Sequence, residues 1–458
     1  MNRLANICLR SLLFLIITII PVDAFSEKFT IDCVTYRTID DKCAEVYSAA
    51  GVDSINIHGE VNGYTVTHIR ERVFFDHHNT YHISIPNTIT HIGNAAFWHC
   101  KYLQELVIPP SVRHIGNYAF NGLHLIKSAT IPKSVTSIGH AIFHPCFVLT
   151  ELNVEEGNPV YDSRENCNGI IETATNTIIA SCLTTKIPNS VKHIGKSCFS
   201  SAEFSSIEIP ESIETIKACA FSSSKIEKIN LPNSITEIGD SAFMLCSSLL
   251  GPLNIPKRVK NIGKNTFLGC IYISSVTFPD SLETIGDEAF NNCTFGDIKL
   301  PSTVKHIGNY AFNHFSKKKV TARITIPDST KTIGTDIINE NHIGVIYNAE
   351  NCTVTKTVFR PKKSILFGRK VKNVPYNLLK HNYNIPIIIS QNTIPPQIDD
   401  DFFNDSIKSF ATLYVPKGYI ETYRKATGWQ KIQNIEENPG EFTSLTLNKS
   451  HLELPELQ

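Results

Sequence analysis

Ten copies of one short motif dominate this chain of 458 residues. Each copy contains an apolar residue, a proline, two variable residues, an aliphatic residue, two more variable residues, Ile-Gly and, two places later, Ala-Phe or a close variant. Most successive prolines are 22 to 24 residues apart. They are Pro86, Pro109, Pro132, Pro188, Pro210, Pro232, Pro256, Pro279, Pro301 and Pro327. A period of this length is typical of a solenoid, in which each coil is too small to bury its own apolar face and neighbouring coils supply the core.

Alignment on the prolines separates buried from exposed positions. The residue before each proline is apolar in all ten copies, and the residue two places earlier is apolar in nine. Such alternation predicts a short strand with one buried face. Isoleucine stands six residues after every proline, and phenylalanine stands eleven residues after nine of them, with Ile338 in the tenth copy. We therefore expect isoleucine ladders and a spine of phenylalanine rings inside the solenoid.

A glycine recurs in the same register. It stands seven residues after the proline in nine copies, and Lys217 replaces it in the other. Glycine at this place fits a backbone position that needs a positive φ or a close approach of the next coil.

Several copies resemble the BspA-type leucine-rich repeat, whose pattern runs Leu-x-x-Leu-x-Ile-Pro-x-Ser-Val-x-x-Ile-Gly-x-x-Ala-Phe-x-x-Cys-x-x-Leu. The segment from Leu106 to Phe120 is an example, and the resemblance covers residues 61–343 strongly. It implies a leucine-rich repeat solenoid, mainly β, with short parallel strands and irregular or short helical return segments. It also implies a secreted or surface protein with a non-catalytic binding role, typically adhesion to host matrix proteins, host cells or other microbes.

The segment before the repeats predicts export. Residues 1–24 fit a secretory signal peptide: Arg3 and Arg10 provide the charged start, Leu12–Ile20 is apolar, and Val22-Asp23-Ala24 offers a small-residue cleavage site. The apolar run is shorter than the ~20 residues that a membrane span needs, so we expect no transmembrane segment. We therefore expect the protein to be secreted or held at the cell surface.

The rest of the chain divides into four parts. Residues 25–60 form an N-terminal cap, and residues 61–343 form the repeats, with an irregular long coil at 155–187. Residues 344–437 contain degenerate repeats and a C-terminal cap, in which a short helix from about Tyr419 to Thr427 is expected. Residues 438–458 form a tail that resembles the start of a bacterial immunoglobulin-like domain.

The charge balance argues against nucleic acid as a partner. The chain has 43 basic and 43 acidic residues, and loss of Arg3, Arg10 and Asp23 with the signal peptide leaves 41 and 42, a formal charge of −1. Positive charge gathers only at Lys317-Lys318-Lys319 and in a short stretch near Arg360 to Lys363. Nucleic-acid binding needs a larger basic surface.

The sequence offers no catalytic motif. It contains no His-Glu-x-x-His, no Gly-x-Ser-x-Gly, no phosphate-binding glycine loop and no Cys-x-x-Cys. We therefore predict no catalytic residue, no cofactor and no metal, and we interpret Asp399-Asp400-Asp401 as a solvated turn rather than a calcium site. Two alternatives to a binding protein stay open. One is a structural spacer that presents another domain, and the other is a secreted hydrolase whose site converges from distant coils, with the irregular coil as the first place to test.

Some cysteines share one position of the repeat, and others lie outside that register. Five cysteines stand fourteen residues after a proline and predict a buried column of small apolar side chains. These are Cys100, Cys146, Cys246, Cys270 and Cys293. One column of sulfur does not provide the tetrahedral geometry of a thiolate metal site. Cys33 with Cys43 and Cys167 with Cys182 are candidate disulfide pairs for an exported protein.

Histidine shares one position, five residues after the proline or its equivalent, in several copies. The residues are His68, His91, His114, His193 and His306. The first three belong to consecutive coils, so their rings would stack on the outside with about 5 Å between backbones. Such a column could bind a transition metal or repel itself on protonation near pH 6. The alternative is an exposed ladder that tolerates any polar residue.

The outward positions of the strands before the prolines form the expected recognition surface, because solenoids bind along their strand-bearing face. This face is polar, mixed in charge and nearly free of aromatic residues, so binding would be spread over many coils. The candidate ligand-binding residues are Glu105, Glu208, Lys228, Asn230, Asn254, Lys299 and Arg323. The expected partners are extracellular proteins or glycans. The alternative is that these side chains are merely solvated.

Overall fold

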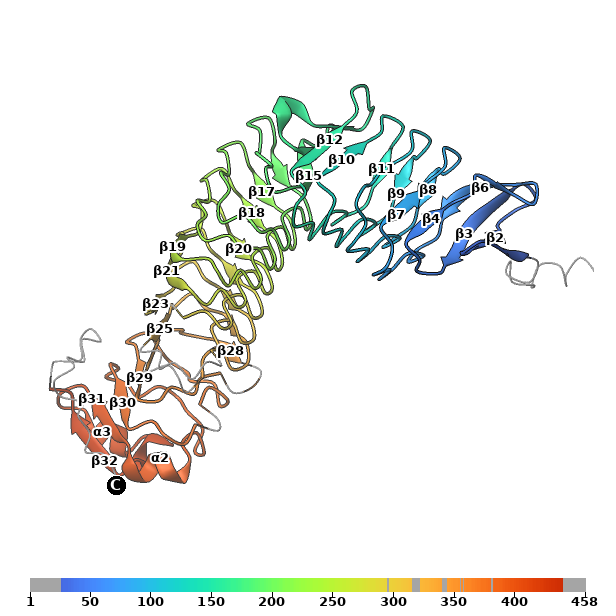
Figure 1. Ribbon diagram of the computed structural model, residues 1–458. Helices are drawn as coiled ribbons and strands as arrows, with labels where there is room; N and C mark the ends of the chain where they lie inside the picture. Colours follow the sequence, from blue (N-terminus) through green and yellow to red (C-terminus); the bar gives the residue numbers. More distant parts are fainter. Residues whose placement is uncertain are drawn as a thin grey trace, which may run out of the picture. The chain divides into compact units, whose positions relative to one another are not determined.

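The structure is a computed structural model that describes residues 26–439, except for residues 295, 315–321, 340–343, 355, 357, 380 and 381. The predicted signal peptide, the lysine triplet at 317–319 and nearly all of the predicted tail lie outside the described residues. The chain folds as two compact units. Unit 1 comprises Met1–Ala174 and Ile179–Thr185, and unit 2 comprises Thr175–Ile178 and Lys186–Gln458. Each unit is a β-solenoid of leucine-rich repeat coils, as predicted, with strands of successive coils side by side (Figure 1).

The coils carry two rows of short parallel strands. We call the strands that precede the prolines the proline row and those that contain the Ile of Ile-Gly the glycine row. In the proline row the side chains alternate between exposed and buried, as in β10 (Ser128–Ile131), where Ala129 and Ile131 are buried. This alternation turns one face of each strand to the core, as the sequence pattern predicted.

Unit 1 starts with antiparallel strands and continues with parallel ones. The antiparallel strands are β1 (Lys28–Ile31), β2 (Val34–Thr38) and β3 (Cys43–Ala49). The glycine row then runs from β3 through β6 (Tyr64–Ile69), β8 (His91–Ile92), β9 (His114–Ile115) and β11 (Ser137–Ile138), with β5 (Glu60–Val61) antiparallel to β6. The proline row contains the pairs β4 (Ser54–Asn56) with β7 (His82–Ser84) and β10 with β12 (Glu151–Val154). The parallel row thus starts at a strand whose other edge is already paired, which protects it from pairing with another chain.

Unit 2 repeats the two rows over more coils. Its glycine row contains the start of β15 (Thr177–Ser181), β16 (His193–Ile194), β17 (Thr215–Ile216), β18 (Glu237–Ile238), β20 (Asn261–Ile262), β22 (Thr284–Ile285), β24 (His306–Ile307), β26 (Thr332–Ile333) and β28 (Thr353–Val354). Its proline row contains β19 (Gly251–Asn254), β21 (Ile273–Thr277), β23 (Ile298–Lys299), β25 (Arg323–Ile326), β27 (Gly344–Tyr347), β29 (Ser364–Phe367), β30 (Ile387–Ser390), β31 (Thr412–Val415) and β32 (Asn434–Glu437). The helices α2 (Asp405–Phe410) and α3 (Ile420–Arg424) lie in the last coils.

A phenylalanine spine is present in both units, as predicted. In unit 1 the stacked rings are Phe74, Phe97, Phe120 and Phe143, with centroids 5.0 to 5.6 Å apart. In unit 2 the rings from Phe199 to Phe312 stack at 5.1 to 5.5 Å and within 10° of parallel. Ile338 is fully buried at the tenth place. Each aromatic pair contributes about 0.5–1.5 kcal/mol beyond its buried area, so the spine couples successive phenylalanine-bearing coils within each unit.

The recurring glycines are needed for close packing of coils and not for a positive φ. A β-carbon on Gly116 would lie 2.6 Å from the backbone nitrogen of Asn94, in the preceding coil. Positive φ falls instead on the residue two places after the glycine position, which is not glycine in any of the ten copies and has φ between 45° and 57°. These residues are Ala95, Tyr118, Ala141, Ser197, Cys219, Ser241, Asn265, Glu288, Tyr310 and Asp336.

The left-handed residue allows backbone hydrogen bonds between coils. The N–H of Tyr118 donates to the carbonyl of His140, and the N–H of Phe120 donates to the carbonyl of Ile142. Left-handed backbone costs a non-glycine residue about 1–2 kcal/mol. The hydrogen bonds between coils contribute about 1 kcal/mol each and offset this cost.

The last coils of unit 2 are closed by two aromatic residues. The indole N–H of Trp429 donates to the carbonyl of Pro396 at 2.7 Å, and the hydroxyl of Tyr423 donates to the carbonyl of Asn392 at 2.9 Å. Both side chains are fully buried. The helix α3 is shorter than the expected segment from Tyr419 to Thr427, and the strand β32, which the sequence pattern did not predict, pairs with β31 after it.

Candidate binding surfaces

The seven predicted ligand-binding residues divide between the two units. Glu105 lies in unit 1, and the other six lie in unit 2. All are exposed except Arg323, which is half-buried and whose backbone N–H donates to the carboxylate of Asp297 at 2.8 Å. Of the six residues in unit 2, Asn254, Lys299 and Arg323 lie in strands of the proline row. Glu208, Lys228 and Asn230 lie in the equivalent segments of earlier coils, which are bridged at Ser206 and Lys228 and are not strands.

The strand register keeps the exposed positions of unit 2 in line. Lys228 is bridged to Ser206, Asn254 is paired with Thr277, and Lys299 is paired with Thr325. Parallel pairing holds equivalent side chains of neighbouring coils about 4.8 Å apart. We call the group formed by Glu208, Lys228, Asn230, Asn254 and Lys299 the strand face.

Three of the five predicted histidines form a column in unit 1. The rings of His68 and His91 are 4.2 Å apart and 10° from parallel, and those of His91 and His114 are 4.4 Å apart and 22° from parallel. His68 Nδ1 and His91 Nδ1 each lie 2.8 Å from the hydroxyl of the preceding threonine. His193 and His306 lie in unit 2, where the Nδ1 atom of each is 2.8 Å from a threonine of the next coil.

The stacking does not fit a metal site. Ring nitrogens bind metals through lone pairs that lie in the ring plane, and in parallel rings these point in parallel directions instead of toward one ion. Within the part of the chain that the structure describes, no group of three or more His, Cys, Asp or Glu side chains is placed to hold a metal ion. Of the two functional roles considered for the column, metal binding and a response to pH, the stacking favours the response to pH.

Electrostatics of the column follow from its packing. Burial lowers the pKa of His68, against the opposing effect of Glu45 on the neighbouring strand. Burial, and then the charges of His68 and His114, lowers the pKa of His91 to about 4. The central ring thus stays neutral in mildly acidic solution.

The structure does not bring Cys33 and Cys43 together. Cys33 immediately precedes β2, where Val34 is paired with Ala49, whereas Cys43 starts β3 at the opposite end of the hairpin. Because Cys43 lies opposite Ile39, about six residues of strand, or roughly 20 Å, separate them. A disulfide needs α-carbons within about 7 Å, so this hairpin corrects the predicted pair.

Cys167 and Cys182 do lie near each other in unit 1. The thiol of Cys167 donates to the carbonyl of Gly169 at 3.4 Å, and that of Cys182 donates to the carbonyl of the adjacent Asn168 at 3.3 Å. Both are free thiols in the structure. Burial, with the charge of Cys182 as a minor contribution, raises the pKa of Cys167 to about 11. A disulfide between them stays a prediction.

The cysteines in register are buried, as predicted, two of them in unit 1 and three in a column of consecutive coils in unit 2. The thiol of Cys100 donates to the carbonyl of Phe74 at 2.9 Å, and the thiol of Cys293 donates to the carbonyl of Phe267 at 3.1 Å. The other three cysteines bond in the same way to the phenylalanine of a preceding coil. The column therefore joins coils by hydrogen bonds, a role that the sequence pattern did not predict.

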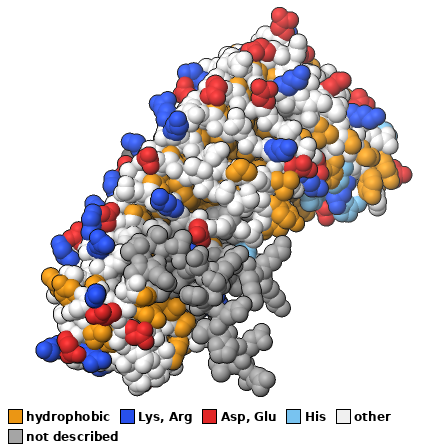
Figure 2. Space-filling view, turned by 90° about the vertical axis from the view of Figure 1, so that its left-hand side faces the viewer, with side chains coloured by type: hydrophobic (Ala, Val, Ile, Leu, Met, Phe, Trp, Pro, Cys, Tyr) orange, Lys and Arg blue, Asp and Glu red, His pale blue; other side chains and the backbone are white. Residues whose placement is uncertain are grey.

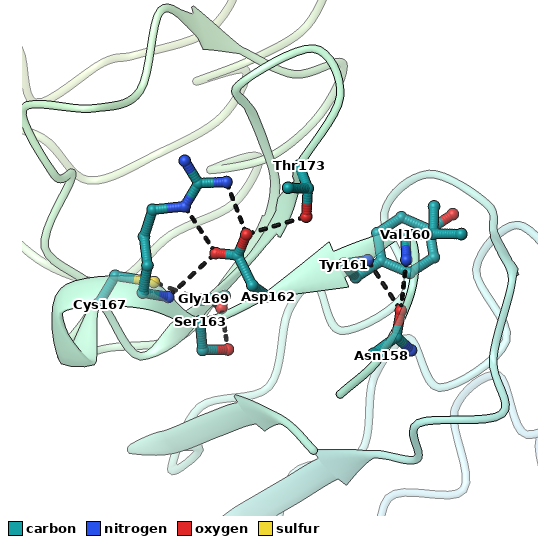
Figure 3. A network of polar contacts seen from close by, with 9 residues as sticks. Asn158, Val160, Tyr161, Asp162, Ser163, Cys167, Gly169 and Thr173 are labelled. Atoms are coloured by element: carbon teal, nitrogen blue, oxygen red, sulfur yellow. Dashed lines mark hydrogen bonds and ion pairs between the residues drawn. The ribbon is translucent and has the colours of Figure 1, made fainter. Parts of the chain in front are cut away.

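The irregular coil is the first place to test for the alternative hydrolase site. In this coil a polar network joins β13 (Tyr161–Asp162) and β14 (Gly169–Glu172) (Figure 3). The carboxylate of Asp162 accepts hydrogen bonds from the guanidinium of Arg164 at 2.6 and 2.8 Å and from the hydroxyl of Thr173 at 2.9 Å. Burial would raise the pKa of Asp162, but these hydrogen bonds outweigh burial and lower it. A carboxylate held ionised in this way stabilises the coil and is poorly suited to general acid catalysis.

Aromatic rings missed by the repeat pattern lie half-buried on unit 1. Trp98 stacks on Tyr118 at 5.6 Å and 19°, and Phe75 meets Trp98 edge to face at 5.5 Å. In these contacts the face of one ring is covered by a neighbouring ring. They therefore join coils and leave little flat surface for stacking a ligand.

The basic stretch near Arg360 to Lys363 is part of a longer basic segment in the degenerate repeats, whose full extent the sequence analysis missed. Residues 351–398 contain eight Lys or Arg and no Asp or Glu. Figure 2 shows Lys and Arg side chains interspersed with Asp and Glu along its left-hand edge. A count of charges by segment would have found this stretch, whereas alignment on the prolines does not reach it.

The fold and its repeat geometry agree with a known family. The family described as the BspA type leucine rich repeat region matches residues 45–167, 179–251 and 250–365 in six copies. The chain belongs to the BspA-type leucine-rich repeat family. No curated protein matches it. Within the described residues, no helix of this family member is long and apolar enough to cross a membrane.

Solved structures similar to this BspA-type chain come from several bacteria. A leucine-rich repeat protein from Eubacterium ventriosum is 21% identical, with 62% of this chain and 93% of that chain covered and a TM-score of 0.46. The pneumococcal vaccine antigen PcpA is 16% identical, with 90% and 98% covered and a TM-score of 0.39. A leucine-rich repeat protein from Bacteroides ovatus is 17% identical, with 90% and 99% covered and a TM-score of 0.37.

Proposed function

We propose that the protein is an exported, non-catalytic adhesin that binds extracellular protein or glycan ligands through the strand face of unit 2. The observation that carries this proposal is that Glu208, Lys228, Asn230, Asn254 and Lys299 are all exposed just before prolines of unit 2. Neighbouring coils are held in register there by the pairs Ser206 with Lys228, Asn254 with Thr277 and Lys299 with Thr325. Membership of the BspA-type family supports a binding role. The basic and apolar start of residues 1–24 supports export.

The physical advantage of the strand face is its rigidity. Asn254 and Lys299 stand on β19 and β23, whose opposite faces are packed in the core through Leu253 and Ile298. Glu208 and Asn230 each precede a buried residue, Ile209 and Leu231, in segments that are joined by the bridge between Ser206 and Lys228. Backbone atoms on such a strand lose little freedom when a ligand binds, which reduces the entropic cost of association. Mixed charge gives hydrogen-bond donors and acceptors at regular spacing, so affinity accumulates over several coils.

The test compares binding to immobilised matrix proteins and a glycan array by the purified protein and two triple variants. The strand-face variant carries Glu208→Ala, Asn230→Ala and Asn254→Ala. The control variant carries Glu237→Ala, Asn261→Ala and Thr284→Ala, which remove the same charge from the glycine row of unit 2.

The proposal predicts saturable binding that the strand-face variant weakens at least about tenfold and the control leaves within about twofold. Equal losses in both variants would place the ligand elsewhere. Absence of binding by the unaltered protein to every ligand would favour the structural spacer.

A further inference from the structure

The basic segment of unit 2 lies beside a groove. Arg369, Lys370 and Lys372 follow directly after β29, and Gln391 and Gln397 follow β30, which pairs in parallel with β29. These side chains line an open cavity of about 1080 Å³. The groove thus collects side chains from the segments that leave neighbouring strands on the same side.

The groove continues across several coils. A second cavity of about 550 Å³ shares Asn373, Pro395 and Gln397 with the first and extends to Thr427. At the other end the first cavity reaches Glu350, in the coil that follows β27. Four coils stacked about 4.8 Å apart give a track of roughly 15 Å, which is long and narrow rather than a closed pocket.

Positive charge in the groove is available to a ligand. Lys370 Nζ lies 2.6 Å from the carboxylate of Asp328, and Lys372 pairs with Glu350, yet the two lysine side chains are 70% and 71% exposed. Exposed ion pairs contribute at most about 1 kcal/mol and exchange partners readily. Arg369 is exposed and has no ion-pair partner among the described residues.

We infer that this groove binds a linear acidic polysaccharide, a chain of sugars that carries sulfate or carboxylate groups. The guanidinium and ammonium groups of Arg369, Lys370 and Lys372 would pair with the anionic groups. The amides of Asn373, Gln391 and Gln397 offer both donors and acceptors to sugar hydroxyls.

The lining favours an acidic polysaccharide over a nucleic acid. None of the residues that line the first cavity is aromatic. Proteins that hold single-stranded nucleic acids stack the bases on aromatic side chains. Duplex binding requires more phosphate contacts than three cations supply. This surface is separate from the strand face, so it adds a second ligand to the proposed function and either one can fail alone.

The experiment measures binding of the full-length protein to heparin, hyaluronan, neutral dextran and a single-stranded DNA oligonucleotide over a range of salt concentrations. The groove variant carries Arg369→Gln, Lys370→Gln and Lys372→Gln. The control variant carries Lys192→Gln, Lys225→Gln and Lys305→Gln, which remove the same charge from exposed lysines of unit 2 that also pair with acidic residues of neighbouring coils. The strand-face variant is measured alongside.

We expect heparin or hyaluronan to bind, dextran not to bind, and affinity to fall as salt rises. The groove variant loses at least about tenfold in affinity, while the control and the strand-face variant stay within about twofold. Three results would overturn the inference: no binding of either acidic polysaccharide, an equal loss in the control, or DNA binding as tight as heparin binding and lost in the same variant.

Discussion

The imidazole ring of His91 lies 4.2 Å from that of His68 and within 10° of parallel, so two ionisable groups of adjacent coils share one desolvated stack. His114 adds a third ring on the other side of His91 at 4.4 Å. Protonation of the central ring would place positive charge between two further imidazoles. The column therefore links acidity to the stability of unit 1.

Acid should destabilise unit 1 through His91. Its pKa in the folded protein is lowered to about 4, below the ordinary value of about 6.5, so the unfolded chain binds the proton more readily. The contribution to stability is complete above about pH 6.5 and is lost as pH falls toward 4. Because the ring is partly exposed, we expect a loss of about 1–2 kcal/mol. Thermal unfolding of the unaltered protein and of the His91→Gln variant, each at pH 7.5 and pH 4.5, measures this loss of stability. An equal shift in both proteins would contradict the role of His91.

The close approach at the glycine positions should not tolerate a β-carbon. In unit 2 a β-carbon on Gly308 would lie 2.4 Å from the backbone nitrogen of Asp287, whereas one on Gly296 would meet nothing within 4 Å. We expect Gly308→Ala to destabilise unit 2 by about 2–4 kcal/mol and Gly296→Ala to change stability by less than about 0.5 kcal/mol. Urea unfolding of the two variants tests this. Similar midpoints for both would show that the coils adjust without strain.

The phenylalanine spine should dominate the packing of unit 2. Phe243 is fully buried and stacks between Phe221 at 5.1 Å and Phe267 at 5.2 Å. Phe243→Ala should destabilise by about 3–5 kcal/mol, because it leaves a cavity and removes two ring contacts. Phe410→Ala, at a side chain that is 41% exposed, serves as the control and should have a small effect. Comparable losses of stability would argue against a continuous spine.

Thiol reactivity should follow burial. Burial raises the pKa values of Cys100 and Cys146 to about 12, so almost no thiolate is present at pH 8. Cys33 and Cys43 are partly exposed and too far apart to pair with each other in the hairpin. Mass spectrometry after brief alkylation of the native, reduced protein should find Cys33 and Cys43 labelled at least about tenfold faster than Cys100. Labelling of all four at one rate would mean that the coils open readily.

Side chains that recur once per coil made the core predictable. Phe97 and Ile115 are examples of ladders in which the same residue type recurs at one position of the repeat. Both side chains are buried in the structure. The left-handed position at Tyr118 was not predictable in this way, because its ten occupants share a backbone conformation and no side-chain property. Backbone hydrogen bonds between coils select that conformation, and they impose no preference for a residue type at this position.

The candidate sites were less predictable than the core. The exposure of Glu208 follows from strand alternation, which the sequence displays. The separation of Cys33 from Cys43 depends on the register of an antiparallel hairpin outside the repeats. The groove around Arg369 is formed by coils in which the repeat has degenerated, so its parts come together only in three dimensions.

Carboxyl-group footprinting shows whether the ligand binds at the strand face of unit 2. Once a ligand is found in the binding screen, the protein is modified at its carboxylates with and without saturating ligand, and the rates at Glu208 and Glu237 are compared. Glu208 lies two residues before Pro210 and Glu237 lies in the glycine row of the same unit, and both are exposed. We expect protection of Glu208 and an unchanged rate at Glu237. Protection of Glu237 with no change at Glu208 would contradict the proposed site.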